Sequence, residues 1–180
     1  ALPIYPDIRK AGVNYLIDIL KAMEKVGSKS LVGAMYSYWP CQFEITDKEA
    51  AWERSIEGMK EVAEAAESLG IECCQEVLNR YETYIITDCR EGLEYCRRVG
   101  SENVNLLLDT FHMNIEEDNI PEAIRLAGRK LGHLHVGESN RKLPGMGSLP
   151  WRDIGRALRD IGYEKGVVME PFLLQGGEVA

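Results

Sequence analysis

The chain has 180 residues, of which 45% are hydrophobic and 28% charged, and its net charge is −8 at pH 7. This length allows one domain with a sizeable core, and no apolar run approaches the ~20 residues that a membrane span needs. A nucleic-acid surface usually shows a basic excess, and none is visible here. A small-molecule partner is therefore favoured over nucleic acid or membrane.

The five cysteines are Cys41, Cys73, Cys74, Cys89 and Cys96, and they form no CxxC pair. An odd number of cysteines without CxxC is typical of reduced thiols rather than of a disulfide framework. The first six residues contain no basic region followed by an apolar stretch, so we expect no signal peptide there. These features predict a cytoplasmic protein.

Helical patterns lie before and between a series of short apolar runs. We expect the first helix to follow Pro6, with Asp7 as its cap and Gly27 at its end. A capping-box pattern of Thr46 and Glu49 opens the second helix, which Gly70 stops. Further helices are expected from Thr87 to before Gly100, from Asn119 through Ala127, and over Ile154, Leu158 and Ile161 before Gly162.

The apolar runs predict five β-strands, because each run is short and bounded by turn residues. Both faces of these runs are apolar, which is typical of parallel strands buried under helices. The predicted strands span residues 31–36, 71–78, 104–108, 131–136 and 166–172, with a long loop at 137–150 and an acidic loop after His112. Strands that alternate with helices predict a parallel α/β sheet in one domain, residues 1–180.

Four side chains with metal-binding chemistry lie at or near the ends of these runs, namely Glu76, Asp109, His135 and Glu170. Active sites of barrels and open parallel sheets lie at the carboxyl ends of the strands. Since alternate side chains of a strand share a face, the four can converge on one point. Three carboxylates and one imidazole suit Mn²⁺, Mg²⁺ or Co²⁺. No cysteine falls at a strand end, so a cysteine-bound zinc is not expected.

Each of these residues also has an ordinary structural interpretation. A single Glu near a strand end is more often solvated or bonded to a loop, and His133 is more often a satisfied barrel-interior histidine than a ligand. Tyr38 and Trp39 are more often packing residues, and Arg141 with Lys142 would alone be a solvated pair of charges. Four candidate ligands on consecutive strands favour a site over coincidence, although spacing alone does not name the reaction.

At these residues the chain resembles the ketose 3-epimerase family, the D-tagatose and D-psicose (allulose) 3-epimerases, whose fold is the xylose-isomerase-like TIM barrel. The matching motifs are SYWP (37–40), EVLNRYE (76–82), LDTFHMNIEE (108–117), HLHVGE (133–138), NR (140–141) and VMEPF (168–172). The resemblance runs from about residue 8 to the C-terminus, and the motifs at 76–82 and 108–117 are specific to it.

The resemblance implies a metal-dependent isomerase that epimerises free ketoses at C3 through a cis-enediolate. The substrate pairs would be D-tagatose with D-sorbose and D-fructose with D-psicose. Glu76, Asp109, His135 and Glu170 would be the ligands of a divalent metal, most simply Mn²⁺, with Co²⁺ or Mg²⁺ as alternatives. Glu76 and Glu170 would be the acid–base pair. Glu82, His112 and Arg141 would hold the polar end of the sugar, and Trp39 and Phe172 would form the walls of the pocket.

The family barrel has eight strands over ~250 residues, whereas five strands are predicted here. The resemblance therefore implies a partial (β/α)8 barrel that covers roughly the C-terminal two-thirds, without the first three strands and the last helix. A homo-oligomer, dimer or tetramer, is implied for the complete protein.

Three other functions remain open on the sequence. A metal-dependent 1,2-isomerase of the hydroxypyruvate- or xylose-isomerase type would use a similar site, and product analysis separates it. An endonuclease IV-like phosphodiesterase shares the barrel but should carry more His and Asp ligands and a basic groove. A non-catalytic fragment or binding subunit could keep the metal site without turnover.

The small number of strands generates a prediction about stability. Five strands leave two open edges and an uncovered inner face. We expect Leu78, Leu107, Leu134 and Val168 to lose the opposite wall. At ~1.5–3 kcal/mol for each large side chain, this loss is comparable to a domain's stability of ~5–15 kcal/mol.

We therefore predict that residues 1–180 alone are not a stable, active monomer. Activity should be weak or absent, and it should return when three amino-terminal strands are supplied. Sedimentation, thermal melting and turnover measurements check this. A monodisperse 20.3 kDa monomer with cooperative melting and full turnover would contradict it.

Overall fold

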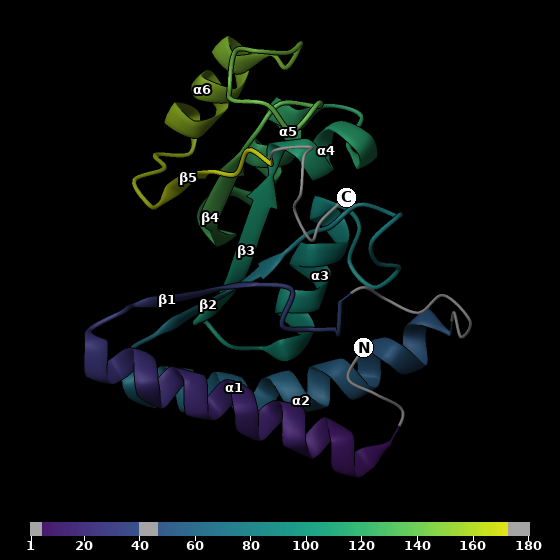
Figure 1. Cartoon of the computed structure of the whole chain (residues 1–180), viewed down its shortest axis with the longest axis vertical. Coiled ribbons are helices and arrows are strands. Elements are labelled where there is room, and N and C mark those ends of the chain that lie inside the picture. The colour runs from purple at the N-terminus through teal and green to yellow at the C-terminus, as the bar shows by residue number, and fades with distance from the viewer. Residues whose placement is uncertain (1–4, 40–46, 173–180) are drawn as a thin grey trace.

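The computed structural model describes residues 5–39 and 47–172. Over these ranges, five parallel strands form one sheet in the order β1-β2-β3-β4-β5, which curls into part of a barrel (Figure 1). The strands are β1 (Ser30–Gly33), β2 (Glu72–Glu76), β3 (Val104–Asp109), β4 (Leu131–Val136) and β5 (Val167–Met169). The predicted parallel α/β architecture is confirmed.

The helices are α1 (Pro6–Val26), α2 (Lys48–Leu69), α3 (Cys89–Val99), α4 (Thr110–Glu116), α5 (Ile120–Ala127) and α6 (Trp151–Asp160), with a short 3-10 turn, η1 (Gly128–Lys130). In Figure 1, α1 and α2 lie side by side at one end of the molecule, and α5 and α6 lie at the other. None of the described helices is both long and apolar enough to cross a membrane.

The carboxyl-terminal ends of the first three helices lie where the sequence predicted them. Gly27, Gly70 and Gly100 terminate α1, α2 and α3 with φ of 74°, 62° and 81°, as predicted. Left-handed backbone at this position strongly favours glycine, because a Cβ atom would be strained there. The three glycine stops are therefore local signals that the tertiary structure left unchanged.

The helix starts differ more from the prediction. Asp7 lies inside α1, because Pro6 takes the first helical position without a side-chain cap. Thr46 lies outside the described residues, and Asp47 caps α2 by accepting the Ala50 N–H at 3.1 Å. Helix α1 thus has no side-chain cap and α2 is capped by Asp47, so both predicted helices are right and their predicted capping residues are wrong.

The third helix shows the same one-residue displacement. Asp88, not Thr87, caps α3 by accepting the Glu91 N–H at 2.8 Å. Thr87 instead donates its N–H and its hydroxyl to the Glu91 carboxylate, at 2.9 and 3.0 Å. The Asp88 and Glu91 carboxylates thus form a reciprocal cap at the start of α3.

Helix α4 occupies part of the segment predicted as an acidic loop. It follows β3 directly, and Asp109 caps it by accepting the Phe111 N–H at 2.8 Å. A helical period is recognised over windows of roughly 11–18 residues, and α4 has seven. The prediction was wrong because the helix is too short to show its period in the sequence.

Three strands are shorter than the apolar runs that predicted them. The ladders of β1, β2 and β5 end at Gly33, Glu76 and Met169, so the predicted strands at 31–36, 71–78 and 166–172 overran. Two residues beyond the β2 ladder the backbone bonds to a loop, where the Leu78 N–H donates to the Ile86 carbonyl at 3.3 Å. After β1 and β2 the overrun includes the buried apolar residues Met35, Tyr36, Val77 and Leu78, whose apolar character reflects burial rather than pairing in the ladder.

One face of the sheet packs against the helices and holds the hydrophobic core. Leu134 belongs to this core with 0% exposure, so the prediction that it faces the inner side was wrong. Since strand side chains alternate, Leu134 points away from its neighbours His133 and His135. The other core residues on the strands include Cys73, Val104, Leu106, Leu108, Leu131 and Val136.

The inner face is better covered than the sequence predicted. Leu78 and Leu107, which were expected to lose their opposite wall, are 5% and 0% exposed. Val168 on β5 is 46% exposed. Of these three side chains, only Val168 on the edge strand shows the expected loss of burial.

Contacts across the inner face support the curl at the amino-terminal ends of the strands. Lys165, just before β5, forms an ion pair with Glu72 on β2, although two strands lie between them. A register shift between Leu106 and Leu107 places Gly132 of β4 against β2. A Cβ atom on Gly132 would lie 2.5 Å from the Cys74 Sγ and 2.9 Å from the Glu72 Oε1, so this close approach requires glycine.

This packing predicts the effect of a methyl group at Gly132. Gly132→Ala should lower the free energy of unfolding by ~1–3 kcal/mol, the usual cost of overpacking. The matched control is Gly155→Ala in α6, where the nearest atom, Arg159 Nη1, is 3.7 Å from the added Cβ. The control should gain up to ~0.5–1 kcal/mol, because alanine favours a helix over glycine. Urea unfolding measures both, and shifts of the same sign would contradict the inferred close approach.

Candidate metal centre

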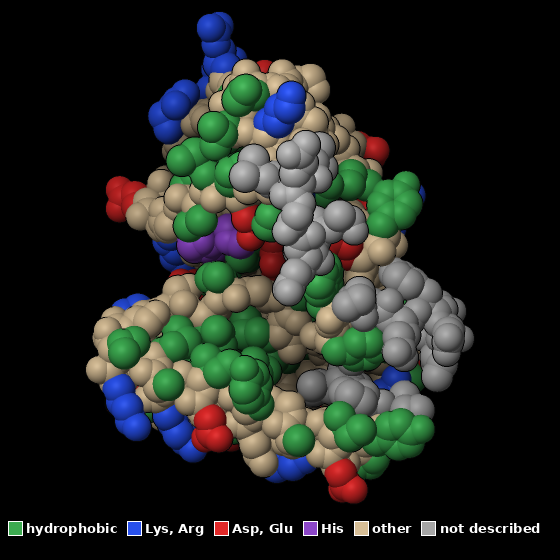
Figure 2. Space-filling model, in the orientation of Figure 1, with side chains coloured by type: hydrophobic (Ala, Val, Ile, Leu, Met, Phe, Trp, Pro, Cys, Tyr) green, Lys and Arg blue, Asp and Glu red, His purple; other side chains and the backbone are tan. Residues whose placement is uncertain are grey.

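Glu76, Asp109, His135 and Glu170 come together at the carboxyl-terminal edge of the sheet. They lie at the end of β2, the end of β3, near the end of β4 and just after β5. One ligand atom from each lies within 4.8 Å of the other three. In the space-filling view, imidazole surface lies beside carboxylate surface in the middle of the visible face (Figure 2). The structure thus brings together the four residues predicted to bind a metal.

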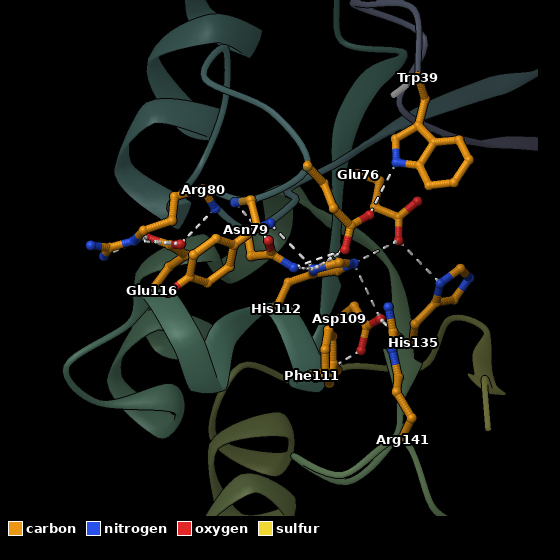
Figure 3. Close-up of polar contacts among 12 residues, drawn as sticks. Trp39, Glu76, Asn79, Arg80, Asp109, Phe111, His112, Glu116, His135 and Arg141 are labelled. Carbon is orange, nitrogen blue, oxygen red and sulfur yellow. Dashed lines mark hydrogen bonds and ion pairs between the residues drawn. The ribbon is translucent and has the colours of Figure 1, made fainter. Parts of the chain in front are cut away.

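His135 has an unpartnered buried atom in the middle of this group. Its Nδ1 has no hydrogen-bond partner, although it lies 3.4 Å from Glu170 Oε1. The same atom lies 3.5 Å from Glu76 Oε1 (Figure 3). Burial lowers the pKa of His135, but the two carboxylates outweigh burial and raise this pKa to about 10. A buried nitrogen aimed between two carboxylates is the arrangement expected where a cation binds.

Asp109 is the most deeply buried member, with 0% exposure. Burial raises the pKa of its carboxyl above the ordinary value, against the lowering effects of His112, the Phe111 N–H and Arg141. Its Oδ1 caps α4, which leaves Oδ2 facing the centre. Three carboxylates and one imidazole nitrogen fit a hard divalent cation such as Mn²⁺, Co²⁺ or Mg²⁺, which would offset the repulsion among the carboxylates.

Arg141 closes one side of the group. Its Nη1 lies 3.0 Å from Asp109 Oδ2 and 3.6 Å from Glu170 Oε2. The guanidinium also stacks over the rings of Phe111 and Phe172, at 3.6 and 4.8 Å from their centroids. Its side chain is only 14% exposed, so the interpretation of Arg141 as one of two solvated loop charges was wrong.

The backbone of Arg141 is strained. Its φ is +58°, and it is the one described non-glycine residue with positive φ. Left-handed backbone costs roughly 1–2 kcal/mol for a residue with a Cβ. Such a conformation persists only where the surrounding structure holds it, and it is common at functional sites.

His112 lies beside the four candidate ligands, and its Nδ1 atom is hydrogen-bonded to Asn79. Its Nδ1 receives the Asn79 backbone N–H at 3.2 Å and the Asn79 Nδ2 at 2.8 Å (Figure 3). The Tyr81 N–H donates to Asn79 Oδ1 at 2.9 Å, which fixes the amide so that Nδ2 is a donor. Nδ1 of His112 is therefore an acceptor without a proton.

It follows that the neutral ring carries its proton on Nε2. Burial lowers the pKa of His112, which favours this neutral form. Nε2 lies 3.7 Å from Asp109 Oδ2 and 4.0 Å from Glu76 Oε1, beyond good hydrogen-bond range of both. The Nε2–H of His112 thus faces these carboxylates without a good hydrogen bond to either of them.

The remaining predicted substrate residues surround the same point. Trp39 Nε1 donates to Glu82 Oε2 at 3.1 Å, and Asn79 Nδ2 donates to Glu82 Oε1 at 2.9 Å. Trp39 is 50% exposed, so it is not a core packing residue. Tyr38, beside it, is 39% exposed. Within the SYWP motif, position 40 lies outside the described residues, as does Cys41.

His133 is near the centre but does not belong to it. It lies on the same face as His135, and the two rings meet edge to face at 5.3 Å between centroids. It is absent from the group of candidate ligands among the described residues. Its Nε2 is nevertheless buried without a hydrogen-bond partner, so the prediction of a satisfied interior histidine was wrong in that respect.

Sequence reasoning assigned no role to four residues that support the site. Arg80 donates two hydrogen bonds to the Glu116 carboxylate, from Nε to Oε1 at 2.9 Å and from Nη2 to Oε2 at 2.8 Å. These bonds connect the loop after β2 to α4. Asn79 orients His112, and Glu138 is fully buried after β4. The position of Glu138, two residues beyond a strand, was the signal available for it. Arg80 and Glu116 are ordinary charges in the sequence.

The chain matches known proteins over most of its length. The family model described as xylose isomerase-like TIM barrel matches residues 4–177. A D-psicose 3-epimerase of Ruminiclostridium cellulolyticum is 53% identical over 175 residues, covering 97% of this chain and 60% of that protein. A D-psicose 3-epimerase of Agrobacterium fabrum is 46% identical over 173 residues, covering 96% and 60%.

A solved structure agrees with these matches. The crystal structure of D-psicose 3-epimerase with D-tagatose from Clostridium cellulolyticum superposes with a TM-score of 0.95 and 52% identity, over 98% of this chain and 62% of that chain. The predicted resemblance to ketose 3-epimerases is thereby confirmed. The chain spans about 60% of the length of the curated relatives that it matches.

The geometry predicts selective loss of metal binding. Glu170→Gln should weaken Mn²⁺ binding by more than the ~10–100-fold that loss of an outer partner costs, because it removes a ligand oxygen. The charge-matched control is Glu164→Gln, an exposed residue between α6 and β5. Calorimetric titration with Mn²⁺ compares the two, after circular dichroism shows that both are folded. Equal affinities would show that Glu170 is not a ligand.

Proposed function

The chain belongs to the xylose isomerase-like TIM barrel family, and from that premise we propose that it forms the metal-binding and proton-transfer part of a ketose 3-epimerase. The reaction would interconvert D-fructose with D-psicose and D-tagatose with D-sorbose. The observation that carries this proposal is the convergence of Glu76, Asp109, His135 and Glu170 within 4.8 Å. The names of the relatives support the substrate class.

The four converging residues would hold one divalent cation, for which we propose Mn²⁺, with Co²⁺ or Mg²⁺ as alternatives. The buried, unpartnered Nδ1 of His135 supports this assignment. When bound, the cation supplies Lewis-acid stabilisation of the negative charge that develops on a sugar oxygen.

Proton transfer is assigned to Glu76 and Glu170. One carboxylate takes the proton from C3, and the C–H electron pair moves toward C2, whose carbonyl becomes part of a planar enediolate. The other carboxylic acid returns a proton to the opposite face of C3, which inverts it without net change in atoms or electrons. Glu76 ends β2 and Glu170 follows β5, with two strands between them, which suits groups that flank a planar intermediate.

The substrate would be oriented by the residues around the carboxylates. His112 offers its Nε2–H to a sugar oxygen, because Asn79 occupies Nδ1. Glu82 and Arg141 would bind hydroxyl groups, as acceptor and donor. The rings of Trp39 and Phe172 would cover the apolar face of the sugar, and Phe172 already stacks on Arg141.

We further propose a cytoplasmic location and a homo-oligomeric state for the active protein. The first is supported by four described cysteines that are free and buried, namely Cys73, Cys74, Cys89 and Cys96. Burial raises the pKa of each thiol to about 12, which keeps the thiols protonated and unreactive. The second rests on the family resemblance, which implies a dimer or tetramer for the complete protein.

The test of the proposed reaction uses residues 1–180 alone and joined to the amino-terminal strands of the R. cellulolyticum relative. With Mn²⁺ and D-fructose, D-psicose or D-tagatose, the joined protein should yield the C3 epimer, detected by chromatography. Glu76→Gln and Glu170→Gln should each lower epimerisation by at least ~10²-fold, the usual contribution of acid–base catalysis. The exposed Glu164→Gln serves as the control, and an absence of epimer in the joined protein would refute the proposal.

The two-carboxylate mechanism also predicts where deuterium enters. In D₂O the joined protein should place deuterium at C3 of the product. Each single Gln variant should still exchange the C3 hydrogen of one epimer without inversion, because its remaining carboxylate faces one side of C3, and the two variants should differ in which epimer exchanges. Mass spectrometry and NMR of the sugars measure this. Label at C1 alone would indicate a 1,2-isomerase instead.

A further inference from the structure

Glu138 is a buried carboxylate that the proposed reaction does not use. It follows β4 by two residues and has 0% exposure. Its Oε1 accepts the Gly145 N–H at 2.7 Å and the Trp151 Nε1–H at 2.5 Å, and its Oε2 accepts the Leu149 N–H at 3.2 Å. Every one of these donors lies in the loop and helix start that follow, so Glu138 holds that segment against the end of β4.

The loop encloses the carboxylate tightly. A Cβ atom at Gly147 would lie 2.3 Å from Glu138 Oε2, so the loop backbone passes directly over the carboxylate. Burial raises the pKa of Glu138, but hydrogen bonds from Trp151 and from the backbone of Leu149, Gly145 and Gly147 outweigh it and hold this pKa below the ordinary value. The group is therefore an anion that is satisfied by neutral N–H donors.

The backbone of Glu138 also begins the turn that carries Arg141. The Arg141 N–H donates to the Glu138 carbonyl at 2.9 Å, and the Glu138 N–H donates to the Lys142 carbonyl at 3.0 Å. Within this closed turn Arg141 takes its strained φ of +58°. Past the turn, the Phe172 N–H donates to the Arg141 carbonyl at 3.2 Å. Glu138 thus binds the turn through its backbone and residues 145–151 through its carboxylate.

We propose that Glu138 is a positioning residue that holds Arg141 in its strained turn, so that the guanidinium faces Asp109 and Glu170. Its carboxylate binds donors in residues 145–151, and Asn140 Nδ2 of the turn donates to the Met146 carbonyl at 3.3 Å, so this segment also holds the turn. The consequence for substrate binding rests on the proposed function, in which Arg141 holds the sugar. Glu138 is not an acid–base group, because loop donors occupy both of its oxygens.

Chemical labelling of Arg141 tests this without reference to activity. Phenylglyoxal modifies accessible arginines, and peptide mass spectrometry resolves each site. In the protein joined to the amino-terminal strands and otherwise unmodified, Arg141, with its side chain 14% exposed, should react slowly, and Arg156, at 57%, should react fast as an internal reference. Glu138→Gln should speed the reaction at Arg141 about tenfold, the effect of losing one hydrogen bond to a charged acceptor, with Arg156 unchanged. The charge-matched Glu164→Gln should change neither.

An unchanged rate at Arg141 in Glu138→Gln would overturn the proposal. If that variant unfolds, all its arginines will react faster together, and Trp151→Phe then decides. That change removes one donor to Glu138 and keeps an aromatic ring at the start of α6. A selective increase at Arg141 in Trp151→Phe supports the proposal, and no increase overturns it.

The kinetic arm uses the protein joined to the amino-terminal strands. Glu138→Gln and Arg141→Ala should each lower kcat/KM, and the double variant should be no worse than Arg141→Ala alone, because Glu138 acts through Arg141. Multiplying effects would overturn that role. If the unmodified joined protein epimerises no ketose, the proposed function fails, whereas the labelling result still decides whether Glu138 positions Arg141.

Discussion

The convergence of three carboxylates at one edge of the sheet is the constraint on which the rest of the site depends. Glu76, Asp109 and Glu170 place like charges within a few ångström of one another, and such charges repel strongly where burial excludes water. Arg141 lies close to Asp109 and Glu170, and His135 lies between Glu76 and Glu170. A divalent cation is the simplest charge that would balance the group.

The surrounding structure leaves little freedom to the groups that face this centre. The Asp109 carboxylate both caps α4 and faces the centre, so the start of one helix fixes a candidate ligand. The Tyr81 N–H sets the Asn79 amide, which in turn sets the proton on His112. Backbone donors perform most of this orientation, and backbone groups move less than side chains. The site is therefore largely formed before a ligand arrives.

The curl of the sheet connects the site to the overall architecture. At the amino-terminal ends of the strands, Lys165 reaches Glu72 across two intervening strands. At the carboxyl-terminal ends, Glu76 and Glu170 approach each other over the same two strands. A cation held there would join β2 to β5 at the open end of the curl. The fold and the proposed chemistry consequently use the same geometric feature, strong curvature of a parallel sheet.

The sequence by itself determined the alternation of strands and helices, the glycine stops, and the edge of the sheet where polar side chains meet. These follow from local periods and from the rule that alternate strand residues share a face. Only the tertiary structure decided that α4 follows β3, that Arg141 is buried in a left-handed turn, and that Glu138 and Asn79 orient their neighbours. Such contacts as Asn79 with His112 join residues far apart in the chain. Local patterns specify which face a residue occupies, but not which distant loop folds over it.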